Sequence, residues 1–169
     1  MALRPTKTFL FRKVSQKLKK IKLKTGIDFA CGDGKNSVFF KTKKYIGIDI
    51  DSNILKKAKK KFPKYKFVKE NMANFNIKKY STDVVLSTNT FQHINSNYRK
   101  KAFKNLISII KKNGYLIVDS DINDLLDFKL KKVKQNFREI ELIYFRNYFN
   151  FAIENFYLKN NFFYFSFKY

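Results

Sequence analysis

The stretch "TGIDFACGDGKNS" (residues 25–37) begins with a short apolar run and ends in a loop that holds two of the chain's five glycines. Gly32 and Gly34 allow the backbone to turn sharply and to approach a ligand without an intervening Cβ. The dinucleotide pattern G-x-G-x-x-G is incomplete, because Ser37 stands at the third glycine position. Asp28 adds a negative charge at the end of the run, where a pyrophosphate gains nothing. The stretch therefore predicts a strand followed by a loop for a cationic ligand.

Strand and helix signals alternate along the chain on both sides of this loop. We expect strands at residues 25–30, 45–49, 65–69, 83–88 and 114–119. We expect helices at residues 35–42, at 52–61 behind a Ser52 cap, and at 97–111 behind Asn95 and Ser96 and ended by "KKNG". Such alternation predicts a mostly parallel sheet with helices on both faces.

The two ends of the chain depart from the alternation. Residues 8–22 carry an apolar stripe at helical spacing, so residues 1–23 are expected to form a basic amphipathic helix ahead of a single domain over 24–169. The tail segments "REIELIYFRNY" and "NNFFYFSFKY" are rich in β-forming residues and are expected to pair antiparallel at one sheet edge. The predicted fold class is α/β: a Rossmann-like, doubly wound, mostly parallel sheet with an antiparallel C-terminal edge pair.

The chain carries a formal net charge of +24, from 37 Lys and Arg against 13 Asp and Glu. Such an excess is typical of proteins that bind nucleic acid. Only five of the basic residues are Arg, the residue that phosphate and guanine recognition favours. Lys, Asn, Phe, Ile and Tyr are all abundant and have codons rich in A and T, so a low-GC genome is the alternative origin of the charge. RNA is therefore an open partner that we do not favour.

Cysteine usage and hydropathy indicate the compartment. The single cysteine, Cys31, excludes an internal disulfide and favours a reducing, cytoplasmic setting. The sequence has no window of about 18 consecutive apolar residues, and its N-terminus lacks the apolar core and cleavage site of a signal peptide. We expect neither a membrane span nor a signal peptide.

Four sequence motifs occur in order over about residues 24–119, and with them the chain resembles the class I S-adenosylmethionine-dependent methyltransferases. "GIDFACGDGKNS" resembles the family's first motif, whose glycine loop wraps the methionine part of the cofactor. "YIGIDIDSNILKKAKKKF" resembles the second, whose acid, here Asp49, takes both ribose hydroxyls. "FVKENMANF" resembles the adenine-contacting turn, with Asn71 where the family usually has Asp. "DVVLSTNTFQHI" resembles the fourth-strand motif of the small-molecule branch, and "LISIIKKNGYLIVDSD" the helix, turn and fifth strand that follow.

The resemblance implies a seven-stranded methyltransferase fold that binds S-adenosylmethionine, and no metal. The cofactor-binding residues that it implies are Asp28, Ala30, Cys31, Gly32, Gly34, Asn36, Asp49, Ile50, Asn71, Met72, Ala73, Thr88 and Asn89. Asn71 keeps a carbonyl and an amide for adenine. Ile50 and Met72 are able to sandwich the adenine ring, with ordinary core packing as the alternative for both. Asp51 is expected to cap a helix or to be solvated.

His93, the only histidine, follows the fourth strand and is the candidate catalytic residue, as a general base, with a structural role as the alternative. The segment "STNTFQHI" holds no Asn/Asp-Pro-Pro-aromatic run and no cysteine, which argues against the commonest nucleic-acid methylations. The expected function is methyl transfer to oxygen or nitrogen of a small molecule, sugar or lipid-linked intermediate. An RNA methyltransferase and a catalytically silent binding subunit are the alternatives. The expected partners are a small-molecule or glycan acceptor and, as one of two alternatives, a second copy of the chain in a homodimer that covers the cleft. The other alternative is a bulky acceptor that covers the cleft itself.

Overall fold

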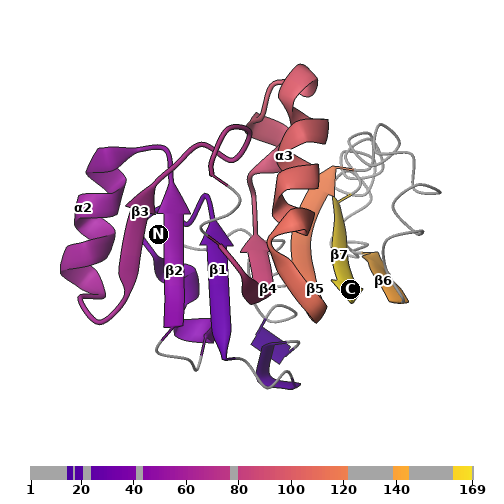
Figure 1. Cartoon of the computed structure of the whole chain (residues 1–169), viewed down its shortest axis with the longest axis horizontal. Coiled ribbons are helices and arrows are strands. Elements are labelled where there is room, and N and C mark those ends of the chain that lie inside the picture. The colour runs from indigo at the N-terminus through magenta and orange to yellow at the C-terminus, as the bar shows by residue number, and fades with distance from the viewer. Residues whose placement is uncertain are drawn as a thin grey trace, which may run out of the picture.

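The computed structural model describes residues 15–16, 18–20, 24–40, 44–76, 80–121, 139–144 and 162–168 (Figure 1). The strands are β1 (Thr25–Phe29), β2 (Lys44–Asp49), β3 (Lys66–Lys69), β4 (Thr82–Ser87), β5 (Ile110–Asp121), β6 (Glu139–Tyr144) and β7 (Phe162–Lys168). The α-helices are α2 (Ser52–Lys61) and α3 (Ser96–Ser108), and the 3-10 helices are η1 (Lys35–Phe39) and η3 (Phe91–His93). The five strands predicted before residue 122 are all confirmed.

The strands form one seven-stranded sheet in the order β3-β2-β1-β4-β5-β7-β6, which spreads across Figure 1. The pairs β1–β2, β2–β3, β1–β4 and β4–β5 are parallel. Strand β7 runs antiparallel to both β5 and β6, so β6 is the edge strand. The predicted fold class is confirmed, including its antiparallel edge pair. The strand order reverses between β1 and β4, and ligands of such sheets bind beyond the carboxyl ends of the strands at this point.

Apolar side chains are buried on both faces of the described parallel strands, as the two-sided apolar pattern of a parallel sheet requires. Along β4, Val85 packs in one core cluster, while its neighbours Val84 and Leu86 pack in the other. Helix α3 contributes to the first cluster, and α2 contributes to the second. Leu18, one of the described residues of the predicted N-terminal helix, is helical and buried in the second cluster. Residues 15–16 and 19–20 are also helical, and the other residues of the predicted helix lie outside the described residues. The predicted domain bounds stay a prediction.

The predicted bounds of the helix at 52–61 are confirmed by α2, but its N-cap is Asp51 and not Ser52. The Asp51 carboxylate accepts hydrogen bonds from the backbone amides of Asn53 at 2.8 Å and Ile54 at 3.4 Å. The backbone of Asp51 is extended, which is the usual conformation of a capping residue. The expected capping role of Asp51 is thus confirmed. The cap of α3 at Asn95 is also confirmed, by a hydrogen bond from the Asn97 amide at 3.1 Å.

Two predicted helices are shorter than expected. Helix α3 ends at Ser108, and the "KKNG" segment lies inside β5, where the register against β4 shifts between Thr82 and Val84. Gly114 permits this close approach, since a Cβ there would stand 2.8 Å from the Asp83 carbonyl oxygen. The helix predicted over 35–42 is the 3-10 helix η1, which ends at Phe39 and is followed by an extended residue. Among the described helices, none is long and apolar enough to span a membrane.

Candidate functional site

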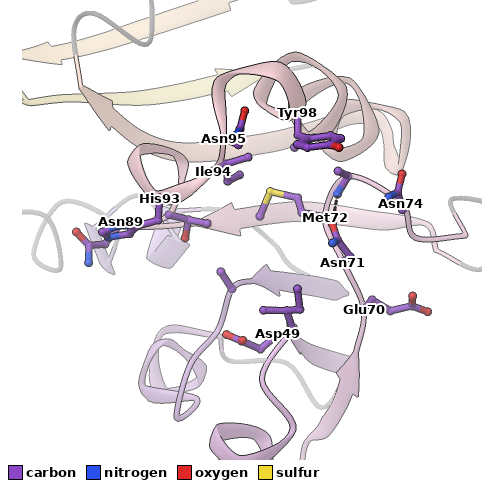
Figure 2. Close-up of a pocket in the computed structure, with 15 residues that line it drawn as sticks. Asp49, Glu70, Asn71, Met72, Asn74, Asn89, His93, Ile94, Asn95 and Tyr98 are labelled. Carbon is purple, nitrogen blue, oxygen red and sulfur yellow. Dashed lines mark hydrogen bonds between the residues drawn. The ribbon is translucent and has the colours of Figure 1, made fainter.

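A cavity of about 620 Å³ opens beyond the carboxyl ends of β1 to β4, where the strand order reverses (Figure 2). Its volume falls within the range of about 300–1,000 Å³ that is typical of ligand sites. The wall of the cavity is formed by the loop after β1, the ends of β2 and β3, the segment between β4 and α3, and α3 itself. The described lining residues are Ala30, Asp49, Ile50, Glu70, Asn71, Met72, Ala73, Asn74, Asn89, Thr90, His93, Ile94, Asn95, Tyr98 and Ala102.

The glycine loop after β1 is tightly wound. Ala30, Gly32 and Gly34 all have positive φ angles, of 56°, 55° and 78°. At Gly34 a Cβ would also stand 2.9 Å from the Phe67 ring, so glycine is needed there for space as well as for conformation. At Ala30 the same left-handed region is reached by a residue with a Cβ, and such strain persists only where the surroundings fix the backbone. Ala30 lines the cavity, so this fixed backbone forms part of its wall.

Asp49 ends β2 and is held in place by two backbone amides. Its Oδ2 accepts from the amide of Gly32 at 2.9 Å, and its Oδ1 accepts from the amide of Asp51 at 3.0 Å. The carboxylate therefore ties the glycine loop to the start of α2. An ionised carboxylate has about four acceptor positions, so Asp49 retains acceptor capacity for a diol in the cavity. Figure 2 shows Asp49 and Tyr98 on opposite sides of the cavity, with Met72 drawn between them.

The turn after β3 supplies the wall predicted for adenine. The Asn71 side-chain oxygen accepts from the Ala73 amide at 2.8 Å, the dashed line in Figure 2. That oxygen thus closes a local turn, a role the sequence prediction did not include. Met72 is a buried member of the core cluster that includes α3, which confirms the core-packing interpretation. It also lines the cavity, and its contact with adenine stays a prediction. Ile50 is 62% exposed and lines the cavity, which favours ligand contact over core packing.

Beneath the glycine loop lies a buried polar cluster around Asp28. Asp28 is fully buried, and its carboxylate accepts from the Tyr45 hydroxyl at 3.0 Å and from the Asn36 side-chain amide at 3.3 Å. The same Asn36 nitrogen donates to the Thr88 hydroxyl oxygen at 3.2 Å. Burial raises the pKa of Asp28 to about 7, although the hydrogen bonds from Asn36 and Tyr45 act to lower it. Asp28 is thus turned into the protein and does not line the cavity.

The structure brings eight of the predicted residues together on the cavity wall. They are Ala30, Asp49, Ile50, Asn71, Met72, Ala73, Asn89 and His93. The other six stand behind that wall: Asp28, Cys31, Gly32, Gly34, Asn36 and Thr88. Cys31 is buried against β2 and β3, and burial raises the pKa of its thiol, which agrees with a packing role.

His93 lies in a short segment whose backbone groups make local hydrogen bonds. Its backbone amide donates to the Thr90 carbonyl at 2.9 Å, and the Arg99 side chain donates to the Ile94 carbonyl at 2.7 Å. Asn89, with a φ of 55°, begins the segment. The His93 side chain is exposed and lines the cavity near Asn89 (Figure 2).

Seven lining residues were not among those predicted from the sequence: Glu70, Asn74, Thr90, Ile94, Asn95, Tyr98 and Ala102. Glu70 and Thr90 follow the ends of β3 and β4. Their position after predicted strands could therefore have identified them as site residues. Tyr98 is 53% exposed on α3, and no sequence pattern distinguishes it from a surface aromatic residue. Glu70 forms a side-chain hydrogen bond with Tyr80, and burial together with this carboxylate raises the pKa of Tyr80.

Comparisons with known proteins agree with this geometry. The crystal structure of the N-methyltransferase NodS from Bradyrhizobium japonicum WM9, in complex with S-adenosyl-l-homocysteine, matches with a TM-score of 0.74 at 12% identity, over 98% of this chain and 88% of that chain. The SAM-bound amino pentose methyltransferase CalS10 from Micromonospora echinaspora matches with a TM-score of 0.64 at 10% identity, over 92% and 89%. At such identities the two likenesses establish the fold.

One curated protein of another kind matches part of this chain. The UDP-N-acetylmuramate–L-alanine ligase of Borreliella afzelii (strain PKo) is 37% identical over 95 residues, which cover 52% of this chain. The chain spans only 20% of that ligase. Over more than half of the chain, residues 27–118, the sequence matches the profile of the family described as "Methyltransferase domain". The chain therefore belongs to the methyltransferase domain family, with the fold of the S-adenosylmethionine-dependent methyltransferases.

Proposed function

We propose that this protein transfers a methyl group from S-adenosylmethionine to an oxygen or nitrogen atom of a small molecule, sugar or lipid-linked intermediate. The observation that carries the proposal is the Asp49 carboxylate, which two backbone amides hold at the cavity wall, at 2.9 and 3.0 Å. A carboxylate fixed in this way is a preorganised acceptor for the two hydroxyls of a ribose.

The chemistry of the cavity fits such a cofactor. Its described lining holds two carboxylates, Asp49 and Glu70, and no Lys or Arg. A sulfonium and an ammonium both carry positive charge, so a wall without cations lowers the electrostatic cost of binding them. Ile50 and Met72 offer apolar surface for a purine ring. The bound cofactor would supply an electrophilic methyl group.

The residues of the chain contribute binding, orientation and proton transfer. Methyl transfer from a sulfonium is an in-line displacement, so positioning of the two reactants and removal of water lower the barrier. The fixed loops after β1 and β4 form a preorganised wall for that alignment. We assign to His93 the removal of a proton from the acceptor, because its exposed imidazole lines the cavity on a segment fixed by backbone hydrogen bonds.

A small acceptor is favoured by two observations. NodS and CalS10, which share the fold, are named as an N-methyltransferase and an amino pentose methyltransferase. The described cavity wall also carries no Lys or Arg that could pair with a phosphate backbone. The RNA methyltransferase alternative rests on the net charge alone. The homodimer and the cytoplasmic setting remain predictions, and light scattering tests the first.

Transfer of labelled methyl groups tests the proposal. Purified protein with methyl-labelled S-adenosylmethionine is incubated separately with metabolite, glycan and RNA fractions. We expect label in the metabolite or glycan fraction, and label confined to RNA would replace the proposal with the RNA alternative. His93→Ala should lower kcat about 100-fold or more. Unchanged turnover in this variant would remove His93 from the chemistry, and no turnover with any fraction would favour the silent binding subunit.

A further inference from the structure

The buried cluster around Asp28 connects parts of the fold that are distant in the sequence. Asp28 is the fourth of the five residues of β1, and Tyr45 lies in the neighbouring strand β2. Asn36 lies in η1, and Thr88 follows β4. Hydrogen bonds join them in the order Tyr45, Asp28, Asn36, Thr88, at 3.0, 3.3 and 3.2 Å. The chain of contacts therefore runs from the inside of the sheet to the segment that leads into the cavity wall.

We propose that Asp28 is a positioning residue, which acts through Asn36 and Thr88 to fix the segment after β4 that carries Asn89 and Thr90 into the cavity. The identity of the ligand in that cavity rests on the proposed function. The positioning role replaces the direct contact between Asp28 and a cationic ligand that the sequence suggested.

The contacts of Asp28 leave little opportunity for direct ligand contact. The side chain is fully buried, and its two oxygens face Asn36 and Tyr45, which both donate to it from inside the protein. Turning the carboxylate toward the cavity would leave the Tyr45 hydroxyl, in a side chain that is itself 1% exposed, without this acceptor. A buried polar group without a partner is unfavourable enough to oppose that movement.

Thr88 transmits the constraint to the cavity wall. Its hydroxyl oxygen accepts from Asn36 on one side, and its carbonyl oxygen accepts from the Thr90 hydroxyl at 2.9 Å on the other. Asn89 between them has a φ of 55°, a left-handed conformation that asparagine adopts more readily than other non-glycine residues, so the anchored Thr88 sets the direction in which the chain continues. Loss of the Asn36–Thr88 contact should therefore relax Asn89 and Thr90, which both line the cavity.

The charged and titratable groups around Asp28 agree with a buried structural acid. Tyr45 from β2 donates a hydrogen bond to Asp28. The charge of the Asp49 carboxylate acts to raise the pKa of Asp28, and the charge of Asp28 acts to raise the pKa of the Cys31 thiol. No cation appears among these groups. Tyr45 thus stabilises the ionised form of Asp28 by its hydrogen bond, and Tyr45→Phe should raise the pKa of Asp28 further.

Two probes separate the positioning role from direct contact. S-Adenosylhomocysteine carries an ammonium, while 5′-methylthioadenosine has the same nucleoside without the amino acid part. Calorimetry of the full chain with each probe should show that Thr88→Val weakens both by the same factor, about threefold to tenfold for one hydrogen bond. Thr88→Ser, which keeps the acceptor oxygen, should retain most of the affinity. Asp28→Asn still offers an oxygen to Asn36, so it should weaken both probes equally and by about threefold at most.

Different results would contradict the positioning role of Asp28 and the proposed cofactor. If Asp28 paired with the ammonium, Asp28→Asn would weaken S-adenosylhomocysteine at least tenfold and leave 5′-methylthioadenosine unchanged, which would overturn the positioning role. Equal affinities of Thr88→Val, Thr88→Ser and the wild type would overturn it as well. Thermal unfolding of each variant identifies a general loss of folding, and Asn36→Ala then serves as a second way to break the contact. Failure of the wild type to bind either probe would contradict the proposed cofactor itself.

Discussion

The two ends of the parallel sheet differ in charge. At the carboxyl ends of the strands, the described residues of the 620 Å³ cavity include two carboxylates and no Lys or Arg. At the amino ends, a cavity of about 400 Å³ is lined by Lys44, Lys64 and Lys66, with no Asp or Glu among its described residues. Both cavities belong to a chain with 37 basic residues. The position of the lysines is therefore more informative than their number.

This difference bears on the origin of the net charge. A compositional bias toward Lys fills solvent-exposed positions wherever a cation is tolerated, and Lys44, Lys64 and Lys66 are all exposed. The described wall of the larger cavity is exposed in part, as at Ile50 and Tyr98, and still carries no Lys. Selection against cations at this wall is what a positively charged cofactor would require.

The largest expected effect is a difference in cofactor affinity between a substitution at the carboxyl ends of the strands and one at the amino ends. Asp49→Ala removes a fixed carboxylate that accepts from Gly32 and Asp51, and we expect S-adenosylhomocysteine binding to weaken by about 1.5–3 kcal/mol, the scale of hydrogen bonds to a charged group. Lys66→Ala, at the amino end, should leave the affinity unchanged. Isothermal calorimetry of both variants measures the effect. Equal affinities of the two variants would remove Asp49 from the site.

A smaller effect should appear in the pH dependence of stability, because the sheet carries one perturbed acid toward each end. Burial raises the pKa of Asp28 from 3.8 to about 7, so the folded state retains a proton that the unfolded state has lost. The free energy of unfolding therefore falls as the pH rises from about 4 to 7, by at most about 1.4 kcal/mol per pH unit from this group. Asp28→Asn should remove this contribution, which urea unfolding at pH 5 and pH 8 measures.

Asp83, at the amino end, supplies the matched control. Burial acts to raise its pKa, but hydrogen bonds from Lys111, Thr25 and Lys24 together hold the pKa below its ordinary value. Its stabilising contribution is present above pH 4 and is lost only as the pH falls through the lowered pKa. Asp83→Asn should therefore reduce stability about equally at pH 5 and pH 8. A wild-type pH slope in Asp28→Asn would contradict the assignment.

The sequence predicted what depends on local pattern. The strands, the glycine loop and the position of Asp49 follow from apolar runs, glycine spacing and the parallel alternation, which together place the carboxyl ends of the strands at one edge. The remaining strands of the fold could also be predicted from the sequence, because the two tail segments are rich in β-forming residues.

The remaining features depend on contacts between distant residues. The sequence predicts that Asp28 faces a ligand, because its position near a strand end does not reveal that the side chain is buried against Tyr45 and Asn36. The turn that captures the Asn71 oxygen and the exposure of Tyr98 on α3 likewise arise from side-chain orientation. Asp51 and Ser52 are both good capping residues, and only the backbone conformation decides between them.

The central claim is that the cavity at the carboxyl ends of the strands binds S-adenosylmethionine. Calorimetric titration of the purified protein with S-adenosylhomocysteine and, separately, with NAD tests it most directly. We expect saturable one-site binding of S-adenosylhomocysteine and no binding of NAD, since the loop lacks the third glycine and the described cavity wall carries two carboxylates and no Lys or Arg for a pyrophosphate. Binding of NAD in preference to S-adenosylhomocysteine would contradict it.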